Sequence, residues 1–63
     1  MRQKARRQDA RAGQTLWRKD HGAYTAITVT AVTPSPKGFK VHYQDENGQL
    51  GKCLLEALYR KIE

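Results

Sequence analysis

Apolar and polar residues alternate in short runs over most of the chain, a pattern typical of β-strands. The clearest run covers residues 39–44, where Phe39, Val41 and Tyr43 fall on one face and polar residues on the other. Similar runs, rich in β-branched and aromatic residues, are separated by turn residues. We predict five strands and one helical turn before the last strand, with the strands at residues 14–19, 23–33, 39–44, 49–53 and 59–62 and the helical turn at 54–58.

The segments between these runs carry turn signals. Gly22 and the Asn47-Gly48 pair accept the positive φ that a tight turn requires. Residues 33–38 contain two prolines, which remove two backbone donors, so we predict a loop there and not a strand.

The longest β-prone run, residues 23–33, departs from strict alternation. Ala26, Val29 and Val32 recur every third residue, which predicts a strand kinked by a bulge so that it serves both halves of a barrel. The inward positions define the expected core, which consists of Leu16, Ile27 or Val29, Val41, Leu55 and Leu58.

Five short strands with a helical turn before the fifth describe a small, all-β, five-stranded SH3-like barrel. The order of turn and apolar residues over residues 13–62 resembles the Tudor/KOW group of these barrels. The resemblance is carried by Gly13, Trp17, Gly22-x-Tyr24-x-Ala26-x-x-Val29-x-x-Val32, Phe39-x-Val41-x-Tyr43 and Leu55-x-x-Leu58. It implies strand faces and loops that contact RNA or DNA.

Some Tudor-like domains read methylated lysine or arginine by boxing the cation with several aromatic side chains. Tyr24 and Tyr43 fall on two cage-like positions, and Trp17 lies slightly early for a third. The hairpin after Tyr43 supplies no further aromatic residue, and a chain of net charge +6 repels basic peptides. The alternative is that both tyrosines are partly buried barrel residues with exposed hydroxyls.

The chain is also similar to the plasmid-borne type II dihydrofolate reductases, whose short chains end in a comparable stretch. Here that stretch runs from Gly48-Gln49-Leu50 through Ala57-Leu58 to Ile62. The Val-Gln-Ile-Tyr run that lines the pore of these tetramers corresponds to Leu50-Gly51-Lys52-Cys53, which lacks the Gln and the Tyr. The resemblance therefore implies a fold and no catalytic residue, and an oligomeric reductase-like protein is the third interpretation.

Charge is distributed unevenly along the chain, whose formal net charge is +6. Residues 1–19 carry seven Lys or Arg and one Asp, whereas residues 20–63 carry five cationic and five acidic residues. After Met1, residues 1–12 contain no apolar side chain larger than Ala. We therefore predict a basic arm at residues 1–12, disordered or forming a solvated helix, ahead of a barrel at residues 13–63.

Other chemistries lack the residues that they need. His21, His42 and the lone Cys53 do not have the close, paired spacing of a zinc site. No base is placed beside Ser35, so we predict no catalytic residue, no metal and no cofactor. One cysteine fits a reducing compartment, and no apolar run is long enough for a membrane span or a signal peptide, which predicts a cytoplasmic protein without membrane contact.

A basic chain with interleaved aromatic residues predicts an accessory or regulatory protein that binds nucleic acid. Cations meet phosphates, and exposed aromatic rings stack on unpaired bases. The predicted contact residues are Arg2, Lys4, Arg6, Arg7, Arg11, Trp17, Arg18, Lys19, Tyr24, Lys37, Lys40, Tyr43, Lys52, Arg60 and Lys61. The alternative is an adaptor that docks on an acidic face of a larger machine such as a polymerase. The choice between DNA and RNA and the oligomeric state stay open.

Overall fold

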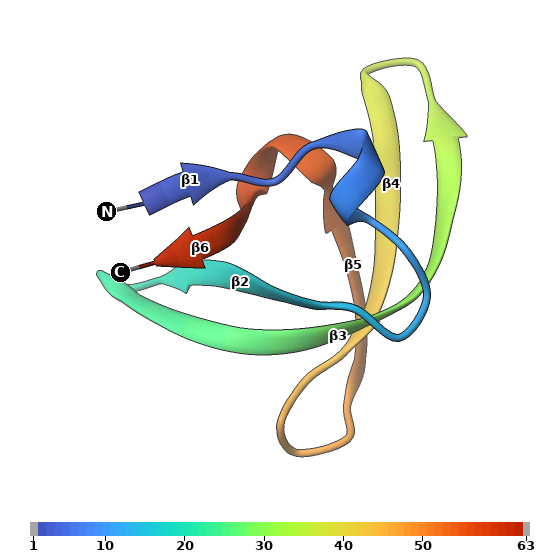
Figure 1. The fold of residues 1–63 in the computed structure, drawn as a ribbon. Helices are drawn as coiled ribbons and strands as arrows, with labels where there is room; N and C mark the ends of the chain where they lie inside the picture. The colour runs from blue at the N-terminus through green and yellow to red at the C-terminus, as the bar shows by residue number, and fades with distance from the viewer. Residues whose placement is uncertain (1, 63) are drawn as a thin grey trace.

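The computed structural model describes the backbone of residues 2–62 and the side chains of residues 3–60. Most of this chain is extended (Figure 1). The elements, in which η marks a single 3₁₀ turn, are β1 (Arg2–Lys4), η1 (Arg7–Asp9), β2 (Thr15–Asp20), β3 (Ala23–Ser35), β4 (Gly38–Gln44), β5 (Leu50–Leu54), η2 (Leu55–Ala57) and β6 (Leu58–Ile62). The prediction of an all-β chain is confirmed.

The strands form one antiparallel sheet in the order β1-β6-β2-β3-β4-β5. The sheet curls strongly (Figure 1), but it does not close, because β1 and β5 are its two edges. The prediction of a five-stranded barrel is therefore wrong on two points. The described chain has six strands, and the sheet that they form is open.

The sixth strand comes from the segment predicted as an arm. Strand β1 pairs with β6, and the Ala5 N–H donates to the Leu58 carbonyl at 3.0 Å. The side chains of Ala5 and Ala10 are buried, with 9% and 2% exposure. A small side chain can be buried completely wherever backbones approach closely, so packing here needs no large apolar residue. The prediction of a disordered or helical arm is wrong for the described part of residues 1–12.

The bulge predicted in the longest strand is confirmed. The register between β3 and β4 shifts between Val29 and Ala31. Val29 lies opposite Tyr43 and Val32 opposite Val41, so the extra residue keeps both valines on the same face of the sheet. Strand β3 consequently pairs with β2 over its first half and with β4 over its second half.

The predicted loop at residues 33–38 is shorter than expected. Strand β3 continues to Ser35, and Pro34 lies opposite Phe39 in the ladder. A proline is tolerated there because the two-residue turn at residues 36–37 makes Ser35 and Gly38 a hydrogen-bonded pair, so the Pro34 nitrogen faces away from β4. On that side β3 pairs with β2 only up to Thr28.

The core lies on the inner face of the curled sheet. Of the predicted core residues, Leu16, Val41 and Leu58 are buried, and Ile27 and Val29 are buried together. Leu55, in η2, packs against this cluster but stays partly exposed. The complete set of buried hydrophobic residues is Ala5, Ala10, Leu16, Ile27, Val29, Val41, Tyr43 and Leu58.

Candidate functional site

Three aromatic residues from three neighbouring strands share the outer face of the sheet. Trp17 in β2 lies opposite Tyr59 in β6 on one side and opposite Ala26 in β3 on the other. Because directly opposite residues in an antiparallel pair point to the same face, the register also places two lysines here, Lys4 opposite Tyr59 and Lys19 opposite Tyr24. We call the surface formed by Lys4, Trp17, Lys19, Tyr24 and Tyr59 the aromatic face.

The rings of the aromatic face contact one another and a lysine. The Tyr24 and Tyr59 rings pack edge to face, with centroids 5.3 Å apart and an interplanar angle of 88°. The Lys4 ammonium lies 4.7 Å from the Tyr59 ring centroid and donates to the Glu56 carbonyl at 2.7 Å. The three aromatic side chains are half-buried. The strand register and these contacts hold the aromatic rings in place, with cationic side chains beside them.

Tyr59 is absent from the predicted contact residues, although the pattern contained a signal for it. Leu58 is predicted as core, and in a strand the next residue points to the opposite face. Trp17 follows Leu16 in the same way, and that relation did identify Trp17 as an outward residue. Applying the same alternation to the last strand places Tyr59 outside.

Tyr43, predicted to contact bases as an exposed aromatic, lies on the inner face and is buried, with 6% exposure. Its hydroxyl accepts a hydrogen bond from Arg18 Nη1. Arg18 is also paired with Asp20 at 3.2 Å, and the pKa of its guanidinium is raised, mainly by Tyr43. Tyr43 and Arg18 thus form a partly buried polar contact that is separate from the aromatic face.

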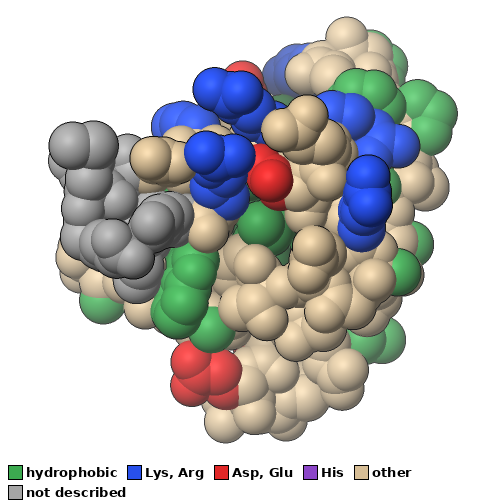
Figure 2. Space-filling view, viewed as in Figure 1, with side chains coloured by type: hydrophobic (Ala, Val, Ile, Leu, Met, Phe, Trp, Pro, Cys, Tyr) green, Lys and Arg blue, Asp and Glu red, His purple; other side chains and the backbone are tan. Residues whose placement is uncertain are grey.

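Other predicted cations surround η1. Arg6, Arg7 and Arg11 are exposed, and the Arg7 guanidinium lies 4.8 Å from the centroid of the Phe39 ring. The Arg6 N–H donates to the Asp9 carboxylate at 2.8 Å. Figure 2 shows Lys and Arg side chains gathered above β1 and η1, with acidic surface among them. This region has a cationic surface, and Asp9 offsets part of its positive charge.

The remaining predicted cations occupy other places. Lys40 and Lys52 lie on the outer face of β4 and β5, and Lys37 is in the turn between β3 and β4. Arg2 and Lys61 lie in the paired strands β1 and β6, but their side chains are outside the described part of the chain. The predicted contact residues therefore do not form one surface.

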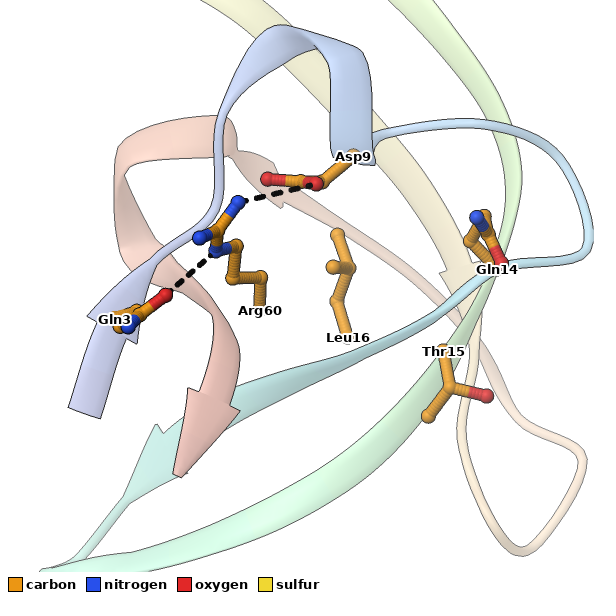
Figure 3. Close-up of a pocket in the computed structure, with 6 residues that line it drawn as sticks. All are labelled: Gln3, Asp9, Gln14, Thr15, Leu16 and Arg60. Carbon is orange, nitrogen blue, oxygen red and sulfur yellow. Dashed lines mark hydrogen bonds and ion pairs between the residues drawn. The ribbon is translucent and has the colours of Figure 1, made fainter. Parts of the chain in front are cut away.

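Arg60 lines an open cavity of about 360 Å³ between β1, η1 and β2 (Figure 3). Its Nε donates to Gln3 Oε1 at 2.8 Å, and its Nη1 lies 4.0 Å from Asp9 Oδ1. The other lining residues are Gln14, Thr15 and Leu16. The charged groups of this cavity already face each other, and its lining offers no nucleophile paired with a base.

The remaining candidate features are a metal site, the cysteine and a membrane span. Among the described residues, no group of three or more His, Cys, Asp or Glu could hold a metal ion. Cys53 is half-buried against the core, and this burial raises the pKa of its thiol. The described chain contains no helix of the length and apolar character needed to cross a membrane.

Comparison with known proteins finds no family model, no curated protein and no solved structure that matches this chain.

Proposed function

We propose that the chain is a small nucleic-acid-binding protein whose aromatic face stacks on unpaired bases while neighbouring cations contact phosphates. The observation that carries the proposal is the shared outward face of Trp17, Tyr24 and Tyr59, with Lys4 and Lys19 in the same register. Flat rings held by a sheet and bordered by ammonium groups match the two parts of a nucleotide, the base and the phosphate.

Energetics favour single strands as the target. Stacking of one base on an aromatic side chain contributes about 1–3 kcal/mol, and only an unpaired base offers its flat surface. The described chain forms one sheet and two single 3₁₀ turns, so no second sheet covers the aromatic face. The ring of Tyr59 is contacted by Tyr24 and Lys4, which leaves Trp17 as the best-suited stacking residue.

The strand order supports an open relative of the SH3-like barrels as part of this proposal. Strands β2 to β6 number five, and η2 stands before the last of them, as the helical turn does in the SH3-like barrels that the sequence resembles. Strand β1 then extends the sheet beyond β6. KOW-like and Tudor-like barrels contact nucleic acid through strand faces and loops, and the aromatic face is a strand face.

A fluorescence-anisotropy titration tests the proposal, with single-stranded and duplex DNA and RNA of equal length at two salt concentrations. Trp17→Ala should weaken binding to single strands by about 1–3 kcal/mol, about five- to 150-fold, and binding to duplex much less. Leu50→Ala is the matched control, because it truncates an exposed apolar side chain away from the aromatic face. Binding to no oligonucleotide at low salt, by a folded protein, would favour the adaptor function instead.

A further inference from the structure

Strand β5 is a free edge of the sheet. It comes last in the strand order, and in the described part of the chain it pairs only with β4. A free edge presents backbone N–H and C=O groups that another extended chain can pair with. The other edge, β1, is only three residues long. Strand β5 is five residues long and therefore offers the more extended template.

The hairpin geometry determines which groups of β5 face outward. The Asp45 N–H donates to the Gln49 carbonyl at 2.9 Å, which makes these two residues a hydrogen-bonded pair. Hydrogen-bonded and non-bonded pairs alternate in an antiparallel ladder. The residues of β5 that bond to β4 are consequently Gly51 and Cys53, opposite Tyr43 and Val41.

The other three residues of β5 direct their backbone N–H and C=O groups away from β4. These residues are Leu50, Lys52 and Leu54, and their side chains share the outer face because they alternate with Gly51 and Cys53. Leu50 is 79% exposed and is the exposed large hydrophobic residue of the described chain. Lys52 is exposed, and Leu54 is half-buried.

The outward positions of β4 and β5 carry basic side chains. Lys40 lies opposite Leu54, and His42 lies opposite Lys52, on the same outer face. In the hairpin turn before β5, the Asp45 carboxylate accepts hydrogen bonds from the amides of Asn47 and Gln49 at 2.8 and 2.9 Å, and the exposed Glu46 follows it. The edge therefore has an apolar–cationic–apolar order with no carboxylate at the described outward positions of β4 and β5.

We propose that the β5 edge binds an extended segment of a partner protein, which adds as a further strand of the sheet. The segment carries an acidic side chain opposite Lys52 and apolar side chains opposite Leu50 and Leu54. Backbone hydrogen bonds supply affinity, and the alternating side chains supply specificity. An acidic residue at the central position complements Lys52 and its neighbours Lys40 and His42.

A second copy of this chain fits the same edge poorly. Antiparallel pairing of two β5 strands about their central residue places Lys52 directly opposite Lys52, and like charges at opposite positions are destabilising. The formal net charge of +6 adds to this repulsion. The edge lies beyond β3 and β4 from the centre of the aromatic face, so the proposal is independent of nucleic-acid binding.

The test is a titration of the ¹⁵N-labelled full chain with a synthetic peptide that contains Val-Thr-Glu-Thr-Val, in which the two Val and the Glu share one face of the strand, followed by amide chemical shifts and hydrogen exchange. The amides of Leu50, Lys52 and Leu54 should shift and exchange more slowly. A control peptide with Lys in place of Glu should bind at least about tenfold more weakly. Lys52→Glu should reverse this preference between the two peptides.

A matched pair of variants isolates the backbone contact. Leu54 has φ −77°, which proline adopts, and its amide points away from β4. Leu54→Pro should lose peptide binding, whereas Leu54→Ala, which also removes the leucine side chain, should retain most of it. Equal binding of both peptides, shifts outside β5, a dimer in sedimentation without peptide, or displacement of the peptide by an oligonucleotide at these amides would each overturn the proposal.

Discussion

At the scale of single residues, Tyr43 is predicted both to share a face with Val41 and to contact bases. The alternation of residues 39–44 correctly puts it on the same face as Val41, and that face is the core. An aromatic residue of the core cannot also stack on a base, so the two predictions for Tyr43 exclude each other. Its ring passes over Gly51, where a Cβ would lie 2.7 Å from the Tyr43 Cζ and hydroxyl oxygen.

Gly51→Ala is therefore expected to destabilise the fold. The new methyl group would overlap the Tyr43 ring, and overpacking of this kind costs about 1–3 kcal/mol. Urea unfolding of the variant, of Tyr43→Leu and of the double variant measures the effect. In the Tyr43→Leu background the same glycine substitution should cost much less, because the ring is absent. An equal cost in both backgrounds would show that the contact is not responsible.

At the scale of elements, strands β2 to β5 were predictable because each shows a local pattern of alternation or turn residues. Strand β1 was not, because its evidence is non-local. Ala5 and Ala10 become core residues only through the pairing of β1 with β6 and the close approach that follows. The aromatic face was predictable in part, since Lys4, Trp17, Lys19 and Tyr24 were named as contact residues. The register that brings Lys4 and Tyr59 beside Trp17 joins three strands and was not predictable from a local pattern.

Removal of residues 1–12 should destabilise the protein. The deletion breaks the β1–β6 ladder, in which each hydrogen bond contributes about 1 kcal/mol, and exposes the core beside Ala5 and Ala10. We expect a loss of at least about 2 kcal/mol, with the melting temperature falling by about 4–8 °C per kcal/mol in so small a domain. The double variant Arg6→Gln/Arg11→Gln serves as the control, because it removes two charges from exposed side chains and leaves the packing of Ala5 and Ala10 in place. An unchanged melting temperature of the deletion variant would instead support a solvated arm at residues 1–12.

At the scale of the whole molecule, the cationic side chains are spread over several surfaces. The sequence shows them only as one overall excess of positive charge. Arg18 and Arg60 have carboxylate neighbours at 3.2 and 4.0 Å, whereas Lys4 and Lys19 lie on the aromatic face. Lys40 and Lys52 lie on the outer face of the other half of the sheet. The net charge of +6 therefore predicts the sign of a partner but not its place.

This separation gives a prediction for the salt dependence of nucleic-acid binding. Phosphate contacts by the two lysines of the aromatic face should give a slope of about −1.4 to −1.8 in log affinity against log salt. Lys4→Gln and Lys19→Gln should each reduce the slope by about 1 and weaken all sequences alike, because phosphate contacts carry no base information. Lys40→Gln, on the other half of the sheet, should leave the slope unchanged. A loss caused equally by all three variants would mean that binding follows net charge alone.

The position of β6 between β1 and β2 also determines the order in which the molecule can fold. Pairs β2–β3, β3–β4 and β4–β5 are hairpins of neighbouring strands, whereas Arg2 meets Ile62 across almost the whole chain. Long-range pairs carry the larger loop-closure cost and form late. Ala5→Gly should then accelerate unfolding and leave the refolding rate unchanged in stopped-flow experiments, whereas Val41→Ala should slow refolding. Equal slowing of refolding by both substitutions would place β1 in the folding nucleus. In the expected case, the separation of β1 from β6 sets the lifetime of the native state, and the hairpins set how fast that state is reached.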